Sequence, residues 1–114
     1  MGYRKVTVKK SIADVKGPWT PIVVGMVEDY EIKLVVFEGK YFWHRHTNHD
    51  EFLYVYDGRI MVDFEDKRVT LTDGEGILIE KNTPHRSRAT RKSVILVFEK
   101  NTIYSDFVRI GEPK

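Results

Sequence analysis

The stretch EFLYVYDGRIMVDF, residues 51–64, decides the fold class. Apolar and polar side chains alternate on both sides of Asp57-Gly58, and alternation with a period of two is typical of β-strands. Asp-Gly is favoured where both residues of a tight turn need positive φ. The stretch therefore predicts a β-hairpin with strands at residues 51–56 and 59–65.

The same pattern continues outward from this hairpin in short apolar runs separated by turn-forming residues. Further strands are predicted at residues 22–27, 31–38, 40–46, 67–72, 76–79, 85–89 and 94–99. Reversals are predicted at EDK (65–67), DGEG (73–76) and TRK (90–92). Many short antiparallel strands indicate an all-β domain, and the pattern leaves a sandwich, a jelly roll and a small barrel open.

The first 21 residues have a different character. Only SIADVK (11–16) could form a helical turn, with Ser11 as its N-cap and Gly17-Pro18 ending it. We expect residues 1–21 to form an N-terminal arm on a single domain of residues 22–114, whose tail could add a last edge strand.

The amino-acid composition narrows the classes of partner and ligand that the chain could have. The 114 residues suffice for one domain, and the net charge of +2 is dispersed, so we expect a small-molecule partner rather than nucleic acid or a membrane. The absence of cysteine excludes disulfides and thiolate ligands, so any metal must be held by nitrogen and oxygen. No apolar stretch approaches the ~20 residues of a membrane span, and we expect a cytoplasmic protein. A charged fraction of 32% without glutamine resembles thermophile proteins.

Three of the four histidines lie in WHRHTNHDE, residues 43–51. Side chains alternate faces along a strand, so His44 and His46 share one side, and a turn at TNHD lets Glu51 face them. His85 should face inward because the arginines of HRSRA have the opposite parity and require water. Three imidazoles and one carboxylate suit one divalent transition metal ion such as Mn, Fe, Co, Ni, Cu or Zn.

Residues 39–58 resemble the first motif of the cupin superfamily, G-x5-H-x-H-x(3 to 4)-E-x6-G, and GEGILIEKNTPH (74–85) resembles the second. Departures are Gly39, one residue nearer to the histidines than the motif asks, and Glu80, Asn82 and Ala89, which replace a proline, a glycine and an asparagine. More widely, residues 33–86 resemble small single-domain cupins related to the phosphomannose isomerase C-terminal domain.

The resemblance implies a double-stranded β-helix, the RmlC-like jelly-roll cupin barrel, over residues 22–114. It also implies one metal ion inside the barrel, held by His44, His46, Glu51 and His85. Cupins of one fold catalyse isomerisation and dioxygenation or only bind ligands, so fold does not fix the reaction. We expect a metal-dependent enzyme of the isomerase or dioxygenase type, acting on a small oxygen-rich molecule. The alternatives are a non-catalytic module that binds a sugar or another small molecule, and a scaffold that the metal stabilises.

The sequence indicates no clear catalytic acid or base. His49, Tyr54 and Glu80 are the weak candidates. His49 has the opposite parity to His46, so we expect a solvated loop histidine away from the ion, and we expect Asp50 to shape the turn.

Aromatic residues lie at positions of the opposite parity to the expected ligands. They are predicted to form an outer face, which must be covered: Trp43, Phe52, Tyr54 and Tyr56. We expect a homodimer through this outer aromatic face, and the alternative is that the N-terminal arm, with Trp19 and Ile22, packs over it.

Overall fold

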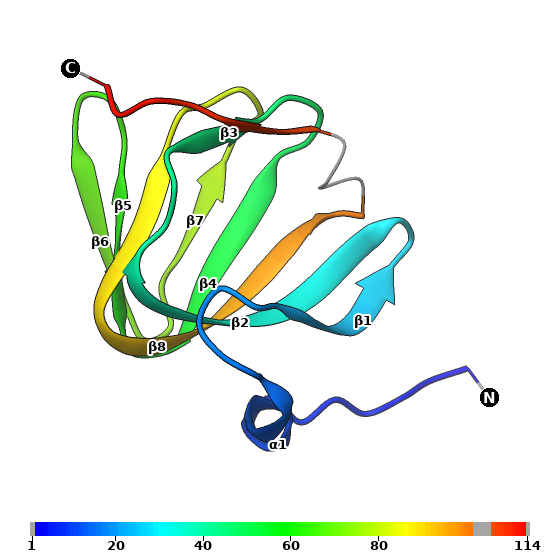
Figure 1. Ribbon diagram of the computed structural model, residues 1–114. Helices are drawn as coiled ribbons and strands as arrows, with labels where there is room; N and C mark the ends of the chain where they lie inside the picture. Colours follow the sequence, from blue (N-terminus) through cyan, green and yellow to red (C-terminus); the bar gives the residue numbers. More distant parts are fainter. Residues whose placement is uncertain (1, 102–105, 114) are drawn as a thin grey trace.

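The computed structural model describes residues 2–101 and 106–113, and Figure 1 shows the arrangement of the elements. Two short helical turns come first, α1 (Val8–Ser11) and the 3-10 turn η1 (Ile12–Asp14). Strands follow at β1 (Ile22–Val27), β2 (Tyr30–Lys40), β3 (His44–His46), β4 (Glu51–Asp57), β5 (Arg59–Asp63), β6 (Arg68–Thr72), β7 (Gly76–Ile79), β8 (Arg86–Lys100) and β9 (Phe107–Arg109). Neither helical turn in this part of the chain is long and apolar enough to cross a membrane.

The strands form an antiparallel jelly roll, which confirms the predicted all-β class. Strands β1, β2, β8, β4 and β7 are neighbours in that order, while β5 pairs with both β6 and β8. Strand β3 pairs with β9, and in Figure 1 this ribbon crosses the upper end of the barrel. The site is built beneath that ribbon.

The connection at Asp57-Gly58 differs from the prediction. Strands β4 and β5 do not pair with each other; each pairs with a different part of β8. Asp57-Gly58 therefore forms a corner of the jelly roll, and the predicted hairpin is wrong. Gly58 still needs its glycine because its φ is 126° and an added Cβ would lie 2.9 Å from the Ser93 Cα.

The predicted reversal at residues 90–92 is also wrong. A single strand, β8, runs through this stretch; its first part pairs with β5 and its second part with β2 and β4. Residues 90–92 are exposed and contain no glycine or proline, so their polarity reflects exposure at a bend rather than a turn.

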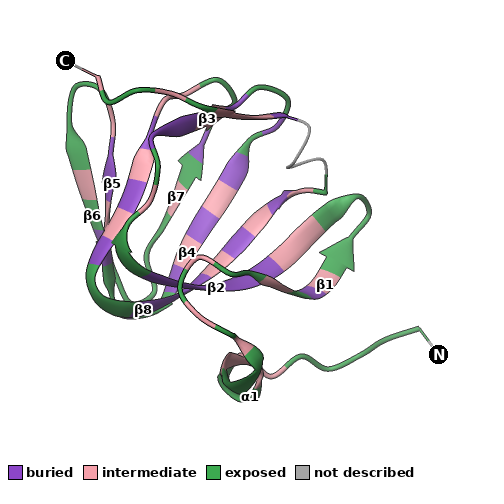
Figure 2. Cartoon of the chain, in the orientation of Figure 1, coloured by how far each residue is buried: buried purple, intermediate pink, exposed green. Residues whose placement is uncertain are grey.

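The core follows the alternation of buried and less buried residues along β4 and β8 (Figure 2). Its fully buried members include Val55, Ile60, Val62 and Ile95. A second cluster, around Leu34 and Val94, receives Val8, Ile12 and Val15 from the N-terminal segment. This segment therefore packs on the outside of the β1–β2 region.

The outer aromatic residues divide into two places. Phe52 and Tyr54 are half-buried and Tyr56 is 38% exposed on the outer face of β4. Trp43 does not line the cavity that contains His44, in keeping with its opposite parity, but it is already buried, with the Arg86 guanidinium 5.2 Å from its ring centroid. Trp19 packs against Phe37, with ring centroids 4.4 Å apart.

Candidate metal centre

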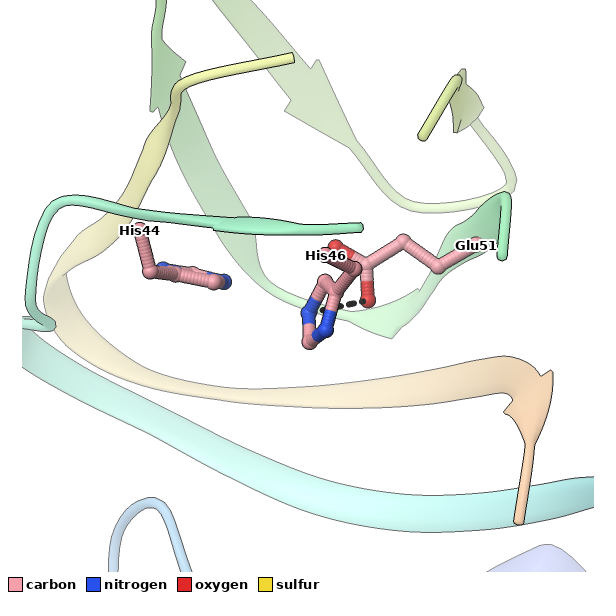
Figure 3. Close-up of side chains that lie close together, drawn as sticks. All are labelled: His44, His46 and Glu51. Atoms are coloured by element: carbon pink, nitrogen blue, oxygen red, sulfur yellow. Dashed lines mark ion pairs between the residues drawn. The ribbon is translucent and has the colours of Figure 1, made fainter. Parts of the chain in front are cut away.

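Three segments bring the predicted ligands together. Strand β3 directs His44 and His46 to the same side, and Glu51 is the first residue of β4. His85 lies opposite His44 in an isolated bridge, in which the two residues exchange backbone hydrogen bonds of 3.0 and 2.9 Å. All four side chains are buried and line one cavity, and Figure 3 shows three of them.

Backbone carbonyls fix two of the imidazoles. Nδ1 of His44 lies 2.8 Å from the Phe42 carbonyl, and Nδ1 of His85 lies 2.8 Å from the Thr83 carbonyl. A carbonyl only accepts, so both Nδ1 atoms donate and each Nε2 is left as the ring's second nitrogen. Burial, followed by the charge of His85, lowers the pKa of His44 to about 3, so its ring is neutral at pH 7. A backbone carbonyl that accepts a hydrogen bond from one ring nitrogen is a usual way in which proteins orient a metal-binding histidine.

The closest contact among these side chains joins His85 Nε2 to Glu51 Oε1 at 2.9 Å. With Nδ1 of His85 donating to Thr83, a neutral ring would present a lone pair to a carboxylate oxygen. Two acceptors stay this close only with a proton or a cation between them. Metal bonds of about 2.0–2.2 Å place neighbouring octahedral ligands about 3 Å apart, so this pair fits an ion.

His46 completes the group. Its Nε2 lies 3.7 Å from Glu51 Oε2, the ion pair drawn in Figure 3, and its ring is edge-on to that of His44. Ligand atoms of His44, His46 and Glu51 all lie within 4.8 Å of one another.

His49 is buried, and the prediction that it is a solvated loop histidine is wrong. Its Nε2 lies 3.1 Å from Glu99 Oε2, and its Nδ1 lies 2.6 Å from Asp106 Oδ2. Burial lowers its pKa, but hydrogen bonding to Glu99 and the charge of Asp106 outweigh burial and raise the pKa. Residues 47–50 lie outside the strands, so parity does not determine where their side chains point.

Glu99 also pairs with a buried lysine. Lys33 Nζ lies 2.9 Å from Glu99 Oε1, and both residues line the cavity. Burial raises the pKa of Glu99, but hydrogen bonds from His49 and Lys33 outweigh it and lower the pKa to about 2. Burial likewise lowers the pKa of Lys33, and Glu99 more than compensates, so this pKa is raised. The result is a buried chain of alternating charges, Lys33, Glu99, His49 and Asp106.

A second group of possible ligands overlaps the first. His46, His49 and Glu99 are all buried, with ligand atoms within 4.8 Å of one another. Both groups use His46. Asp106 stands behind it, with Oδ1 3.6 Å from His46 Nδ1.

Sequence reasoning missed Lys33, Glu99 and Asp106. A signal existed for the first two: Lys33 has the inward parity of Val35 on β2, and Glu99 that of Val97 on β8. A charged residue at an inward position must find a partner. Asp106 had no such signal because it precedes a short strand in the tail.

The structure places the three weak catalytic candidates at different distances from the cavity. Tyr54 lies on the outer face of β4, and Glu80 is exposed after β7, so neither lines the cavity. His49 does not line the cavity either, but it contacts Glu99, which does. Asp50 shapes the turn as expected, with Oδ1 accepting the Lys81 backbone N–H at 2.9 Å.

The cavity has a volume of about 110 Å³ and is partly open to solvent. Its charged and polar lining consists of Lys33, Glu51, Glu99, Ser87 and the three predicted histidines. Its remaining walls are apolar, half of them aromatic (Trp19, Phe37, Tyr41 and Phe107) and half aliphatic (Pro21, Val35, Leu53 and Val97).

Comparisons with known proteins agree with this architecture. Residues 34–99 match the family model described as Cupin domain. The uncharacterized protein YdbB of Bacillus subtilis (strain 168) is 36% identical over 87 residues, which are 75% of this chain and 77% of that protein. A cupin-2 domain containing protein from Shewanella frigidimarina superposes with a TM-score of 0.82 at 30% identity, covering 84% of this chain and 94% of that one.

The fold is shared further afield. Hydroquinone 1,2-dioxygenase from Sphingomonas sp. TTNP3, solved with 4-hydroxybenzoate bound, gives a TM-score of 0.72 at 20% identity, covering 84% of this chain and 73% of that one. The match of the family model over more than half of the sequence, together with the Bacillus relative, shows that the chain belongs to the cupin family.

Proposed function

We propose that His44, His46, Glu51 and His85 hold one divalent transition metal ion and that the chain is a metal-dependent enzyme acting on a small oxygen-rich molecule. The observation that carries this proposal is the 2.9 Å approach of His85 Nε2 to Glu51 Oε1. Both atoms are acceptors in the arrangement that the Thr83 carbonyl favours, and a shared cation removes their repulsion.

The donor set supports an ion from the series Mn, Fe, Co, Ni, Cu and Zn, because imidazole and carboxylate suit these metals. With four protein ligands, such an ion would keep room for substrate oxygens. When bound, such an ion supplies Lewis-acid polarisation of a chelated oxygen or, if it is redox-active, oxygen chemistry.

The protein's own groups would orient the ligands and shield the site. The carbonyls of Phe42 and Thr83 hold two imidazoles in one tautomer. The buried pair of Lys33 and Glu99 places a fixed cation and anion at the cavity wall. Aromatic walls limit the entry of water, which strengthens electrostatic interactions inside the cavity.

The reaction type is proposed at the level of isomerase or dioxygenase. The Sphingomonas dioxygenase shares the fold at 20% identity, and this fold hosts several chemistries. The narrower resemblance to phosphomannose isomerase-type cupins stays a prediction. So do the cytoplasmic location, the thermophile-like stability and the arm of residues 1–21 on a domain of residues 22–114.

Metal loading followed by two assays tests the proposal. Untagged protein is stripped with EDTA and loaded with Zn(II) or anaerobically with Fe(II), and bound metal is measured. The Fe(II) form is assayed for oxygen consumption with hydroquinone, and the Zn(II) form for sugar phosphate isomerisation. Glu51→Gln should lose the ion, whereas Glu80→Gln, at an exposed glutamate, should keep it.

One ion per chain with turnover in either assay supports the proposal. One ion without turnover in either assay contradicts this choice of reactions and favours the non-catalytic binding module. Failure to take up any metal contradicts the metal site itself.

A further inference from the structure

One wall of the cavity is a row of flat rings. Trp19 and Tyr41 have ring centroids 4.9 Å apart, and Tyr41 meets His44 edge-on at 5.4 Å. Phe107 lies 4.8 Å from His44 with an interplanar angle of only 22°. The row therefore leads from Trp19 to the proposed ligand His44, and flat rings offer most contact to a flat ligand.

Trp19 occupies its place at a conformational cost. Its φ is 63°, in the left-handed region, which costs a bulky residue about 1–3 kcal/mol. Its backbone N–H donates to the Val36 carbonyl at 2.8 Å, and its Nε1–H donates to the Glu38 carbonyl at 2.9 Å. Strain maintained by two hydrogen bonds to β2 indicates that the position of this indole matters.

The charges that line the cavity favour one negative charge on the ligand. Lys33 and Glu99 neutralise each other at 2.9 Å. Glu51 would offset one of the two positive charges of a divalent ion, and histidine ligands add none because a metal binds the neutral imidazole. A single positive charge remains for a ligand to balance.

The volume of the cavity limits the size of the ligand. The cavity volume of about 110 Å³ is smaller than the ~150 Å³ of an engineered cavity that binds benzene. Because the cavity is partly open, a ring of five or six atoms fits with one edge at the mouth.

We propose that the metal-loaded cavity binds a small flat monoanion: an unsaturated ring of five or six atoms that bears one charged oxygen group. The charged oxygens face the ion, and the ring lies along the Trp19–Tyr41 wall. This inference rests on the proposed metal site and names the substrate class of that site.

Isothermal titration of Zn(II)-loaded protein with three matched probes tests the inference. Furan-3-carboxylate is the flat anion, furan-3-carboxamide is flat but neutral, and oxolane-3-carboxylate is an anion with a puckered ring. We expect furan-3-carboxylate to bind at least about tenfold more tightly than the carboxamide, because its hydrogen bonds are charge-assisted. It should bind roughly three- to tenfold more tightly than the puckered acid.

Variants at Trp19 test whether its ring belongs to the wall that contacts the ligand. Trp19→Leu should abolish the preference for the flat acid, Trp19→Phe should restore most of it, and Tyr30→Leu, at an exposed aromatic, should leave it unchanged. Zinc content measured on each variant confirms a folded site.

The outcomes separate the two proposals. Zinc uptake without preference for the flat anion, or an unchanged preference in zinc-loaded Trp19→Leu, overturns this inference and leaves the metal site standing. A Trp19→Leu chain that takes up no zinc while Trp19→Phe keeps the wild-type preference supports the wall. If the wild-type chain takes up neither Zn(II) nor Fe(II), both proposals are overturned.

Discussion

Replacing Lys33 by methionine tests the buried charge chain. The substitution keeps most of the length of the side chain and removes the cation 2.9 Å from Glu99 Oε1. Glu99 is only 3% exposed, and removing one partner of a buried ion pair costs about 3–5 kcal/mol. His49 still contacts the other carboxylate oxygen at 3.1 Å, so we expect the lower end, about 3 kcal/mol.

Urea unfolding of the metal-free protein at pH 7, followed by tryptophan fluorescence, measures this loss. The control is Lys40→Met, because Lys40 is exposed on the same strand and should change the free energy of unfolding by at most about 0.5 kcal/mol. Adding Glu99→Gln to Lys33→Met should recover part of the loss, because a neutral amide costs less to bury than a carboxylate. A loss below about 1 kcal/mol for Lys33→Met, or a double variant that costs the sum of the two singles, would refute the reasoning.

Three further predictions concern stability and assembly. Burial and the charge of His85 lower the pKa of His44 from 6.5 to about 3, so the unfolded chain binds more protons between these values. The metal-free protein should therefore lose free energy of unfolding as pH falls through this window, by at most about 1.4 kcal/mol per pH unit from this group, and His44→Phe should flatten the dependence measured by urea midpoints. Gly58→Ala should cost about 3 kcal/mol in urea unfolding, since a Cβ would press on Ser93, whereas Gly39→Ala, at φ 81° but with no neighbour within 4 Å, should cost about 1–2 kcal/mol. The predicted homodimer should sediment at about twice 13.4 kDa at micromolar concentration, and a monomer would contradict it.

Local strand positions were predictable from sequence, whereas strand partners were not. The alternation around Asp57-Gly58 predicts two strands, and both exist as β4 and β5. A dipeptide that suits a tight hairpin also suits a corner, because both need glycine's positive φ. Which role it takes depends on β8. This strand pairs with both β4 and β5 from more than 20 residues away, and its polar bend looks like a turn.

The candidate site was predictable where side chains lie in or next to strands of fixed parity. His44, His46 and Glu51 meet His85 because strand geometry determines their directions. His49 was misplaced because its loop has no such parity, and Asp106 reaches it from the tail. The contacts between these two residues depend on how the β3–β9 ribbon closes the barrel, which no local pattern encodes.

Anomalous diffraction from crystals of the metal-loaded chain, recorded at the absorption edge of the ion, shows whether the four proposed ligands hold the ion. We expect one peak between His85 Nε2 and Glu51 Oε1, within about 2.0–2.3 Å of nitrogen atoms of His44, His46 and His85. A peak among His46, His49 and Glu99, or no peak in the barrel, would contradict it.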